Sequence, residues 1–168
     1  MGNRIKTLEN NVVTNYTSNN VNAYTNISGK LNIAPKYDDN GNMLNDDKHT
    51  YKYDYNNKLV SVNDADGTYK YDALGRRIAK NGTLYYYAGD QMIEEVTGDA
   101  VTSYLYGNNI DEALQMKREG DTYYYHKNHL GSTMAITQKE GKLQERVEYD
   151  VYGTPSFFDA EGNNIEAS

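Results

Sequence analysis

The chain has 168 residues, enough for one domain of ordinary size, and its hydrophobic fraction of 38% includes 18 tyrosines but only two Phe and no Trp. Because a buried tyrosine hydroxyl needs a partner or water, this composition predicts a thin structure with every ring near a surface. The net charge of −7, with 17 basic residues scattered among 24 acidic ones, disfavours nucleic-acid binding, and the absence of Cys excludes disulfides and cysteine zinc sites.

Along the chain, five segments share one pattern: an aromatic residue, Asp, two variable residues, then Gly or Asn. The four that begin with Tyr carry Tyr37, Asp38 and Gly41; Tyr53, Asp54 and Asn57; Tyr71, Asp72 and Gly75; and Tyr149, Asp150 and Gly153. A fifth, Phe158 to Gly162, has Phe in the first position. The Asp side chain can accept a hydrogen bond from the backbone two residues on, and the last position needs φ > 0, which Gly and Asn adopt cheaply. Each motif therefore predicts a strand end, a turn and the return strand of a hairpin.

The strands that enter these turns show tyrosines at every second position, which places each set on one face of a strand. The sets are Tyr51, Tyr53 and Tyr55; Tyr69 and Tyr71; Tyr85 and Tyr87; Tyr104 and Tyr106; and Tyr123 and Tyr125. Tyrosines of successive repeats are expected to form stacked ladders across the sheet. No convincing helix is predicted; residues 110–118 could make a helical turn or two, but Gly107 and Gly120 bound them closely.

The spacing of the motifs predicts one array over residues 1–168, with an antiparallel, twisted sheet of about ten or more short hairpin strands. The segment Gly2 to Ile5 is similar to the return half of a repeat, and Ile165 to Ser168 follows the fifth turn. We therefore expect a window from a longer array that is open at both ends. Exposed strand edges of this kind can pair with neighbouring repeats or with other copies.

The tyrosine-aspartate repeats resemble the Rhs/YD-repeat family. The strongest match is the run Tyr123-Tyr124-Tyr125-His126-Lys127-Asn128-His129-Leu130-Gly131-Ser132, which is similar to the core signature of that family. Segments from Tyr104 and up to Pro155 match what usually precedes and follows it, so residues 104–155 are expected to form the core signature region.

The resemblance implies a fold and a role. Members of the family wind β-hairpin repeats into a sheet that curls into a hollow shell, which in bacterial toxins encloses a C-terminal toxic domain; teneurins carry a related shell. It further implies a secreted or injected bacterial protein, although no signal peptide follows Met1 and no apolar run approaches a membrane span. Self-cleavage and toxicity are not expected here, because the matching segment ends before those parts.

Three other patterns suggest a metal site, a calcium loop and a glycosidase pair, and each fits a structural role better. His126 and His129 would lie on opposite faces of a strand, so a hydrogen-bonded turn is favoured over metal binding. The acidic turns at Asp38 and Asp64 lack the Gly and Glu positions of a calcium loop. Adjacent acids such as Glu94 and Glu95 point to opposite faces, which disfavours a glycosidase pair.

We therefore expect a non-catalytic wall segment without cofactor or metal, in which the motif residues are structural and a polypeptide cargo is the possible enclosed partner. The alternative is a self-assembling or adhesive extracellular module that uses stacked β edges or tyrosine rows. Exposed tyrosines can also stack on sugar rings, so weak carbohydrate binding remains a second alternative.

Overall fold

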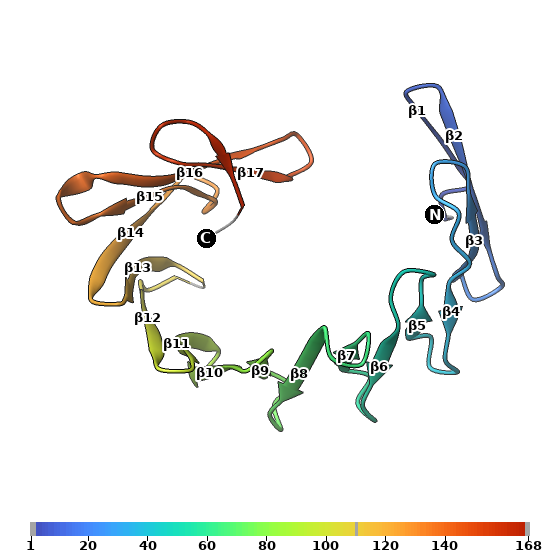
Figure 1. The fold of residues 1–168 in the computed structure, drawn as a ribbon, viewed down its shortest axis with the longest axis horizontal. Coiled ribbons are helices and arrows are strands. Elements are labelled where there is room, and N and C mark those ends of the chain that lie inside the picture. The colour runs from blue at the N-terminus through green and yellow to red at the C-terminus, as the bar shows by residue number, and fades with distance from the viewer. Residues whose placement is uncertain (1–2, 110, 167–168) are drawn as a thin grey trace. The chain divides into compact units, whose positions relative to one another are not determined.

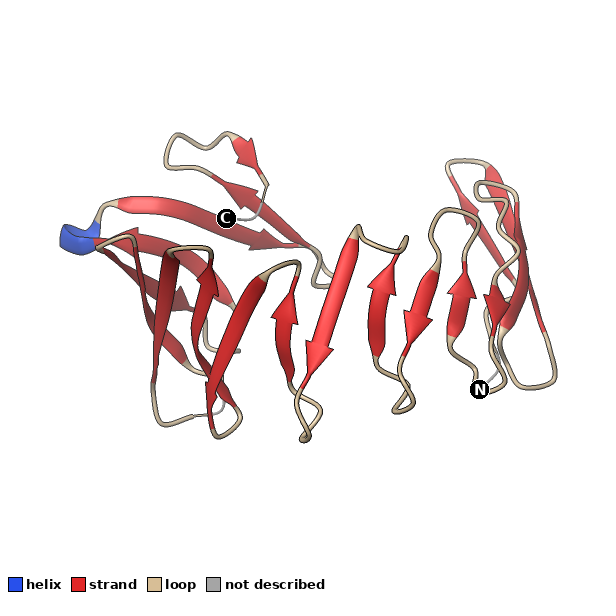
Figure 2. Cartoon of the chain, turned by 60° about the horizontal axis from the view of Figure 1, so that its bottom comes forward, coloured by secondary structure: helices blue, strands red, loops and turns tan. Residues whose placement is uncertain are grey.

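The computed structural model describes residues 3–109 and 111–166, and strands make up 56% of these residues. Figure 2 shows the described chain as strands and turns, with one short helical segment in blue. That segment is the 3-10 turn η1 (Lys139–Gly141). The all-β fold expected from the sequence is confirmed. No helix among the described residues has the length and apolar character needed to cross a membrane.

The chain divides into two compact units, residues 1–82 and residues 83–168. The first contains a three-stranded sheet in the order β1-β2-β3, the hairpin β4-β5, and the neighbouring strands β6 to β9. Every pair is antiparallel and joins strands that follow each other in the sequence. The strands are β1 (Lys6–Glu9), β2 (Val12–Ser18), β3 (Tyr24–Ser28), β4 (Lys36–Tyr37), β5 (Met43–Asn45), β6 (Tyr51–Tyr53), β7 (Leu59–Val62), β8 (Gly67–Tyr71) and β9 (Arg77–Lys80).

The second unit is a continuous antiparallel meander in which each strand pairs with the next. Strands β12 to β17 follow a curve in Figure 1. The strands are β10 (Thr83–Ala88), β11 (Gln91–Thr97), β12 (Ala100–Tyr106), β13 (Ala113–Arg118), β14 (Asp121–Lys127), β15 (Thr133–Gln138), β16 (Leu143–Tyr149), β17 (Pro155–Phe158) and β18 (Asn164–Ile165).

The register explains part of the twist. In β4, β6 and β8 the pairing shifts by one residue at the tyrosine that ends the strand, between Lys36 and Tyr37, Lys52 and Tyr53, and Lys70 and Tyr71. An extra residue on one strand is a β-bulge, which bends the strand and increases its right-handed twist. In these three repeats the bulge therefore recurs at the same place, with the extra residue on the return strand, opposite the step into the tyrosine that precedes the turn aspartate.

The core is thin, as the composition indicates. The buried apolar residues among those described are Ala79, Met116, Ile136 and Val147, with exposed fractions of 3% to 9%. None of the tyrosines is buried, so each ring keeps an edge at a surface. A structure of this kind is held by strand pairing and turns more than by a central core.

Three sequence expectations need correction or lie outside the described residues. Residues 113–118 do not form the helical turn that the sequence allowed, because Ala113–Arg118 is the strand β13, paired on both sides; Ile110 lies outside the described residues. Tyr55 does not continue the tyrosine row of β6, because Asp54 already begins the turn and leaves Tyr55 92% exposed at its tip. Gly2, in the expected return half Gly2 to Ile5, and residues 167–168, after the fifth turn, also lie outside the described residues.

The expected tyrosine ladders are also wrong. The tyrosine-rich strands alternate with strands that carry other residues in register, so Tyr104 lies opposite Met116, Tyr125 opposite Ile136 and Tyr85 opposite Glu95. Tyrosine rows two strands apart are separated by about 9.6 Å, twice the strand spacing, which is too far for stacking. Tyr16 and Tyr24, outside these rows, make a ring contact at 5.4 Å between centroids.

Candidate functional site

The most repeated local structure is a turn in which one side chain holds the backbone. In six turns of the described chain, the Oδ1 atom of the first residue accepts hydrogen bonds from the backbone N–H groups two and four residues on, at 2.7–3.1 Å. The first residues of these turns are Asp38, Asp54, Asp72, Asn128, Asp150 and Asp159. The bond from the N–H group two residues on is the one expected from the sequence. The bond from the N–H group four residues on was not expected.

The position three residues after the aspartate has the positive φ that the pattern indicates. Gly41, Asn57 and Gly75 have φ values of 86°, 60° and 80°. The N–H group of each donates back to the carbonyl oxygen of the turn aspartate, at 3.0–3.1 Å. Both ends of each turn are therefore closed by hydrogen bonds within six residues.

Asn128 is the turn residue that the sequence reading missed. It stands where the other turns have Asp, follows Lys127 instead of Tyr, and accepts from Leu130 at 2.9 Å and Ser132 at 3.1 Å. The core signature run is therefore another copy of the repeat turn with a neutral acceptor. The signal was Gly131 three residues later, with the positive φ of 84° that the other turns show.

The carboxyl groups of four turn aspartates have lowered pKa values. The side-chain hydrogen bond from Asn42 lowers the pKa of Asp38, and that from Asn163 does the same for the pKa of Asp159. At Asp150 the backbone N–H groups of Thr154 and Tyr152 lower the pKa. At Asp72, desolvation acts to raise the pKa, but hydrogen bonds from Arg76 outweigh it and the pKa is lowered. These carboxylates are therefore ionised at neutral pH, where they make charge-assisted bonds.

Successive turns in the first unit are also joined to each other. The Nδ2 atom of Asn42 donates to the Oδ1 atom of Asn57 in the next turn, at 2.7 Å. The hydroxyl of Tyr71 donates to the carbonyl oxygen of Leu59 at 2.9 Å, and the ammonium of Lys58 lies 5.9 Å from the centre of the Tyr71 ring. Repeats are thus tied together by side chains as well as by strand pairing.

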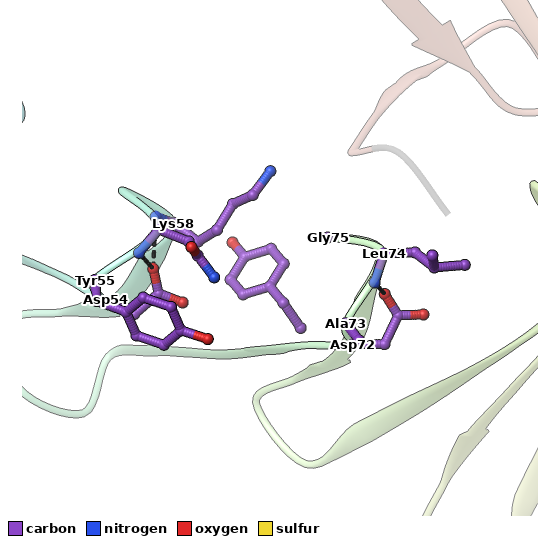
Figure 3. Close-up of a pocket in the computed structure, with 9 residues that line it drawn as sticks. Asp54, Tyr55, Lys58, Asp72, Ala73, Leu74 and Gly75 are labelled. Atoms are coloured by element: carbon purple, nitrogen blue, oxygen red, sulfur yellow. Dashed lines mark hydrogen bonds between the residues drawn. The ribbon is translucent and has the colours of Figure 1, made fainter.

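An open cleft of about 630 Å³ lies between two of these turns. Figure 3 shows Asp54, Tyr55 and Lys58 on one side of it and Asp72, Leu74 and Gly75 on the other. One oxygen of each aspartate in the cleft binds its own backbone, and the second oxygen of Asp72 also binds Arg76 at 2.7 Å. The polar groups of the cleft therefore serve largely to hold the turns.

One face of the second unit carries hydrogen-bonded tyrosines. Tyr104 donates to the carboxylate of Glu95 at 2.8 Å, and Tyr106 donates to the carbonyl oxygen of Met92 at 2.8 Å. Partial burial is the largest cause that raises the pKa of Tyr104 and that of Tyr125, and the Glu95 carboxylate adds to the effect at Tyr104. These phenols stay protonated and act as donors.

The two histidines of the core signature are not brought together. His126 lies on β14 and its Nε2 atom is 2.9 Å from the Thr137 hydroxyl, whereas His129 is exposed at the tip of the Asn128 turn. No group of three or more His, Cys, Asp or Glu residues within the described ranges is arranged to hold a metal ion.

Comparison with known proteins gives the family. The family model described as Teneurin YD-shell matches residues 2–156. The chain is 35% identical over 157 residues to the tRNA3(Ser)-specific nuclease WapA of Bacillus spizizenii and to the tRNA nuclease WapA of Bacillus subtilis strain 168. In both matches the alignment covers 83% of this chain, which spans only 7% of the length of those relatives.

A likeness among solved structures was also found. A mutant form of the Photorhabdus luminescens Tc holotoxin pore is similar with a TM-score of 0.44 and 14% identity, over 86% of this chain and 10% of that chain. The resemblance stated from the repeats is confirmed by the family match, which extends over most of the sequence. The chain belongs to the Teneurin YD-shell family.

Proposed function

We propose that the chain is a non-catalytic segment of a shell wall, formed as one array over residues 1–168 with a core signature region at 104–155. The observation that carries this proposal is the six-fold repeat of one self-closed turn, in which the first side chain binds its own backbone. The motif residues, from Tyr37 and Asp38 to Asp150 and Gly153, then have a structural role. Membership of a shell family supports the same role.

Containment of a polypeptide is the proposed task of the wall. A sheet with few buried apolar residues and many hydrogen-bonded tyrosines offers a polar surface, which holds a chain without strong specificity. The partners are then neighbouring repeats and an enclosed cargo, and the setting is that of a secreted or injected bacterial protein. Membership of a shell family supports this setting and the matched relatives are bacterial, whereas the net charge of −7 argues against nucleic acid as a partner.

The nuclease relatives give the sharpest test of the non-catalytic part. Their names describe tRNA cleavage, but this chain aligns with only 7% of their length. We expect the purified 168-residue chain to leave tRNA intact over hours, with and without divalent metal, on a denaturing gel. Cleavage that survives further purification and is lost on a point substitution in this chain would contradict the proposal.

The second candidate is a self-assembling or adhesive module, favoured by the unpaired outer edge of β18 in the described sheet. Sedimentation velocity across a concentration series separates the two. A single species near 19.1 kDa supports a self-contained piece of wall. A ladder of growing species supports edge-to-edge assembly, and a glycan array tests the weaker carbohydrate alternative.

A further inference from the structure

One buried carboxylate in the second unit lacks a partner. Glu145 on β16 is 6% exposed, and its Oε2 atom has no hydrogen-bond partner among the described residues. A buried charged oxygen without a donor is costly, so native structures usually supply one.

Strand register shows that Glu145 interrupts an apolar row. It lies opposite Ile136, and Ile136 is opposite Tyr125 on the other side. Residues paired across antiparallel strands point to the same face. The carboxylate therefore stands on the face that also carries the buried Met116 and Val147.

This face curls around a cavity of about 110 Å³. Met116 on β13 and Ile165 on β18 both line it, although four strands separate them in the sheet. In a flat sheet these strands would lie about 24 Å apart, so the cavity exists because the face is concave. The remaining lining residues are Arg118, Tyr123, Ile136, Gln144 and Glu145.

A second carboxylate on the same face shows what Glu145 lacks. Glu95 lies opposite Thr102, two residues before Tyr104, and its Oε1 atom accepts from the Tyr104 hydroxyl at 2.8 Å. Glu95 therefore has a donor from its own sheet. Glu145 lines the cavity, and no donor of its own sheet reaches its Oε2 atom among the described residues.

We propose that this cavity is a binding site for a primary ammonium group on a short alkyl chain, chemically the end of a lysine side chain or a small free amine. The ammonium would donate to the carboxylate of Glu145, and the amide oxygen of Gln144 offers a second acceptor, because the Gln144 NH₂ group is occupied by Gln138 at 3.1 Å. Met116, Ile136 and Ile165 give the apolar wall that a methylene chain needs.

The size and the ligand set favour this class over a metal ion. At about 30 Å³ for each water-sized group, the cavity has room for roughly four non-hydrogen atoms, the number in propylammonium. A hard divalent cation takes six or more oxygen ligands, and this cavity is lined by a single carboxylate. The site stands on these contacts whether or not the chain encloses a cargo.

Arg118 is the cation already at the cavity, and its position defines the competing explanation. Its guanidinium carbon lies 5.7 Å from the centre of the Tyr123 ring, and no ion pair joins it to Glu145 in the described part of the chain. If Arg118 stays on Tyr123, its charge repels an incoming ammonium. If it moves to Glu145 in solution, it fills the cavity itself.

The test uses the full chain and n-propylammonium, followed by NMR shifts of the Met116 and Ile136 methyl groups. We expect saturable shifts with propylammonium and none with n-propanol, its neutral counterpart. Glu145→Gln should weaken binding at least about tenfold through loss of a charge-assisted hydrogen bond. Glu148→Gln, on the same strand but 54% exposed, is the matched control and should not change it. Arg118→Met should strengthen binding severalfold.

The outcomes separate the explanations. Equal shifts with propanol, no saturable shift, or unchanged binding by Glu145→Gln would overturn the proposal. So would a loss of stability in Arg118→Met equal to that in Glu145→Gln and not additive with it, because Arg118 would then be the native partner. If Glu145→Gln does not fold, the propanol comparison and Arg118→Met still decide. The peptide acetyl-Gly-Lys-Gly-amide distinguishes the sources: binding supports a lysine side chain, and binding of propylammonium alone supports a free amine.

Discussion

Replacing Asn128 by alanine tests whether the core signature is a repeat turn. The substitution removes two hydrogen bonds from the backbone, from the N–H of Leu130 in an exposed position and from that of Ser132 in a partly buried one, and also the weak bond from Asn128 Nδ2 to the Met134 sulfur at 3.6 Å. A typical bond of this kind contributes about 0.5–1.5 kcal/mol net, and the exposed donor can turn to water, so the exposed bond belongs at the low end. We expect Asn128→Ala to lower the free energy of unfolding by about 1–2 kcal/mol.

Urea denaturation followed by circular dichroism measures this loss, and thermal melting gives a second reading. A loss of 1 kcal/mol lowers Tm by about 4–8 °C in a unit of 60–100 residues. Asn128→Asp keeps the acceptor of both backbone bonds, loses only the weak bond to the Met134 sulfur, and should nearly match the native chain. Asn40→Ala, at the exposed tip of the Asp38 turn, is the control and should change stability by less than about 0.5 kcal/mol. Equal stability of Asn128→Ala and Asn40→Ala would refute the assignment of Asn128 as a turn residue.

Three further predictions follow from burial, hydrogen bonding and charge. Val147→Ala, at a site 3% exposed, should lower the free energy of unfolding in denaturant by about 2 kcal/mol. Val101→Ala, at a site 46% exposed, should lower it by less than about 0.5 kcal/mol, and equal losses would contradict burial of the face that carries Val147. Tyr104→Phe removes the hydroxyl that donates to Glu95 and should lower the free energy of unfolding by about 1–2 kcal/mol in the same assay. Tyr86→Phe, at a site 49% exposed, should be neutral, and the reverse order would contradict the role of the Tyr104 hydroxyl. The turn aspartates with lowered pKa values stabilise the fold at pH values above their unfolded pKa of about 3.9. The denaturant midpoint should therefore stay constant near neutral pH and fall as the pH drops below about 4. A midpoint that does not change between pH 5 and pH 3 would contradict this linkage.

The turns could be predicted because their chemistry is local. An aspartate, a spacing of three residues and a Gly or Asn are enough to indicate a side chain that accepts from the backbone and a position with φ > 0. The Asn128 turn was not predicted because the pattern requires Tyr followed by Asp. Lys127 and Asn128 stand in those two positions, and Asn128 still accepts the same backbone hydrogen bonds. A search for any Asx residue three positions before a glycine would have found it.

The cross-strand contacts could not be predicted in the same way. Every second residue of a strand faces one side, so the rows of tyrosines on single strands were correct for β8 and β14. Which residue lies opposite each tyrosine depends on turn length and on the bulges, and these place Met116 opposite Tyr104 and Tyr123. Burial of Glu145 depends on the curl of the whole face, to which no local pattern in the sequence corresponds.

A repeat array built in this way can become longer without needing a larger hydrophobic core. Each turn is closed by its own aspartate or asparagine, and each strand pairs with its sequence neighbours, so every repeat brings its own stabilising contacts. In repeat structures of this kind, stability is approximately a sum of repeat terms and nearest-neighbour terms. A substitution in the Asp38 turn should therefore leave the second unit nearly unchanged, whereas a change at Val147 should not alter the first. The curled face around Glu145 is the exception, because its cavity joins strands β13 and β18 that are not neighbours, and there one residue affects several repeats at once.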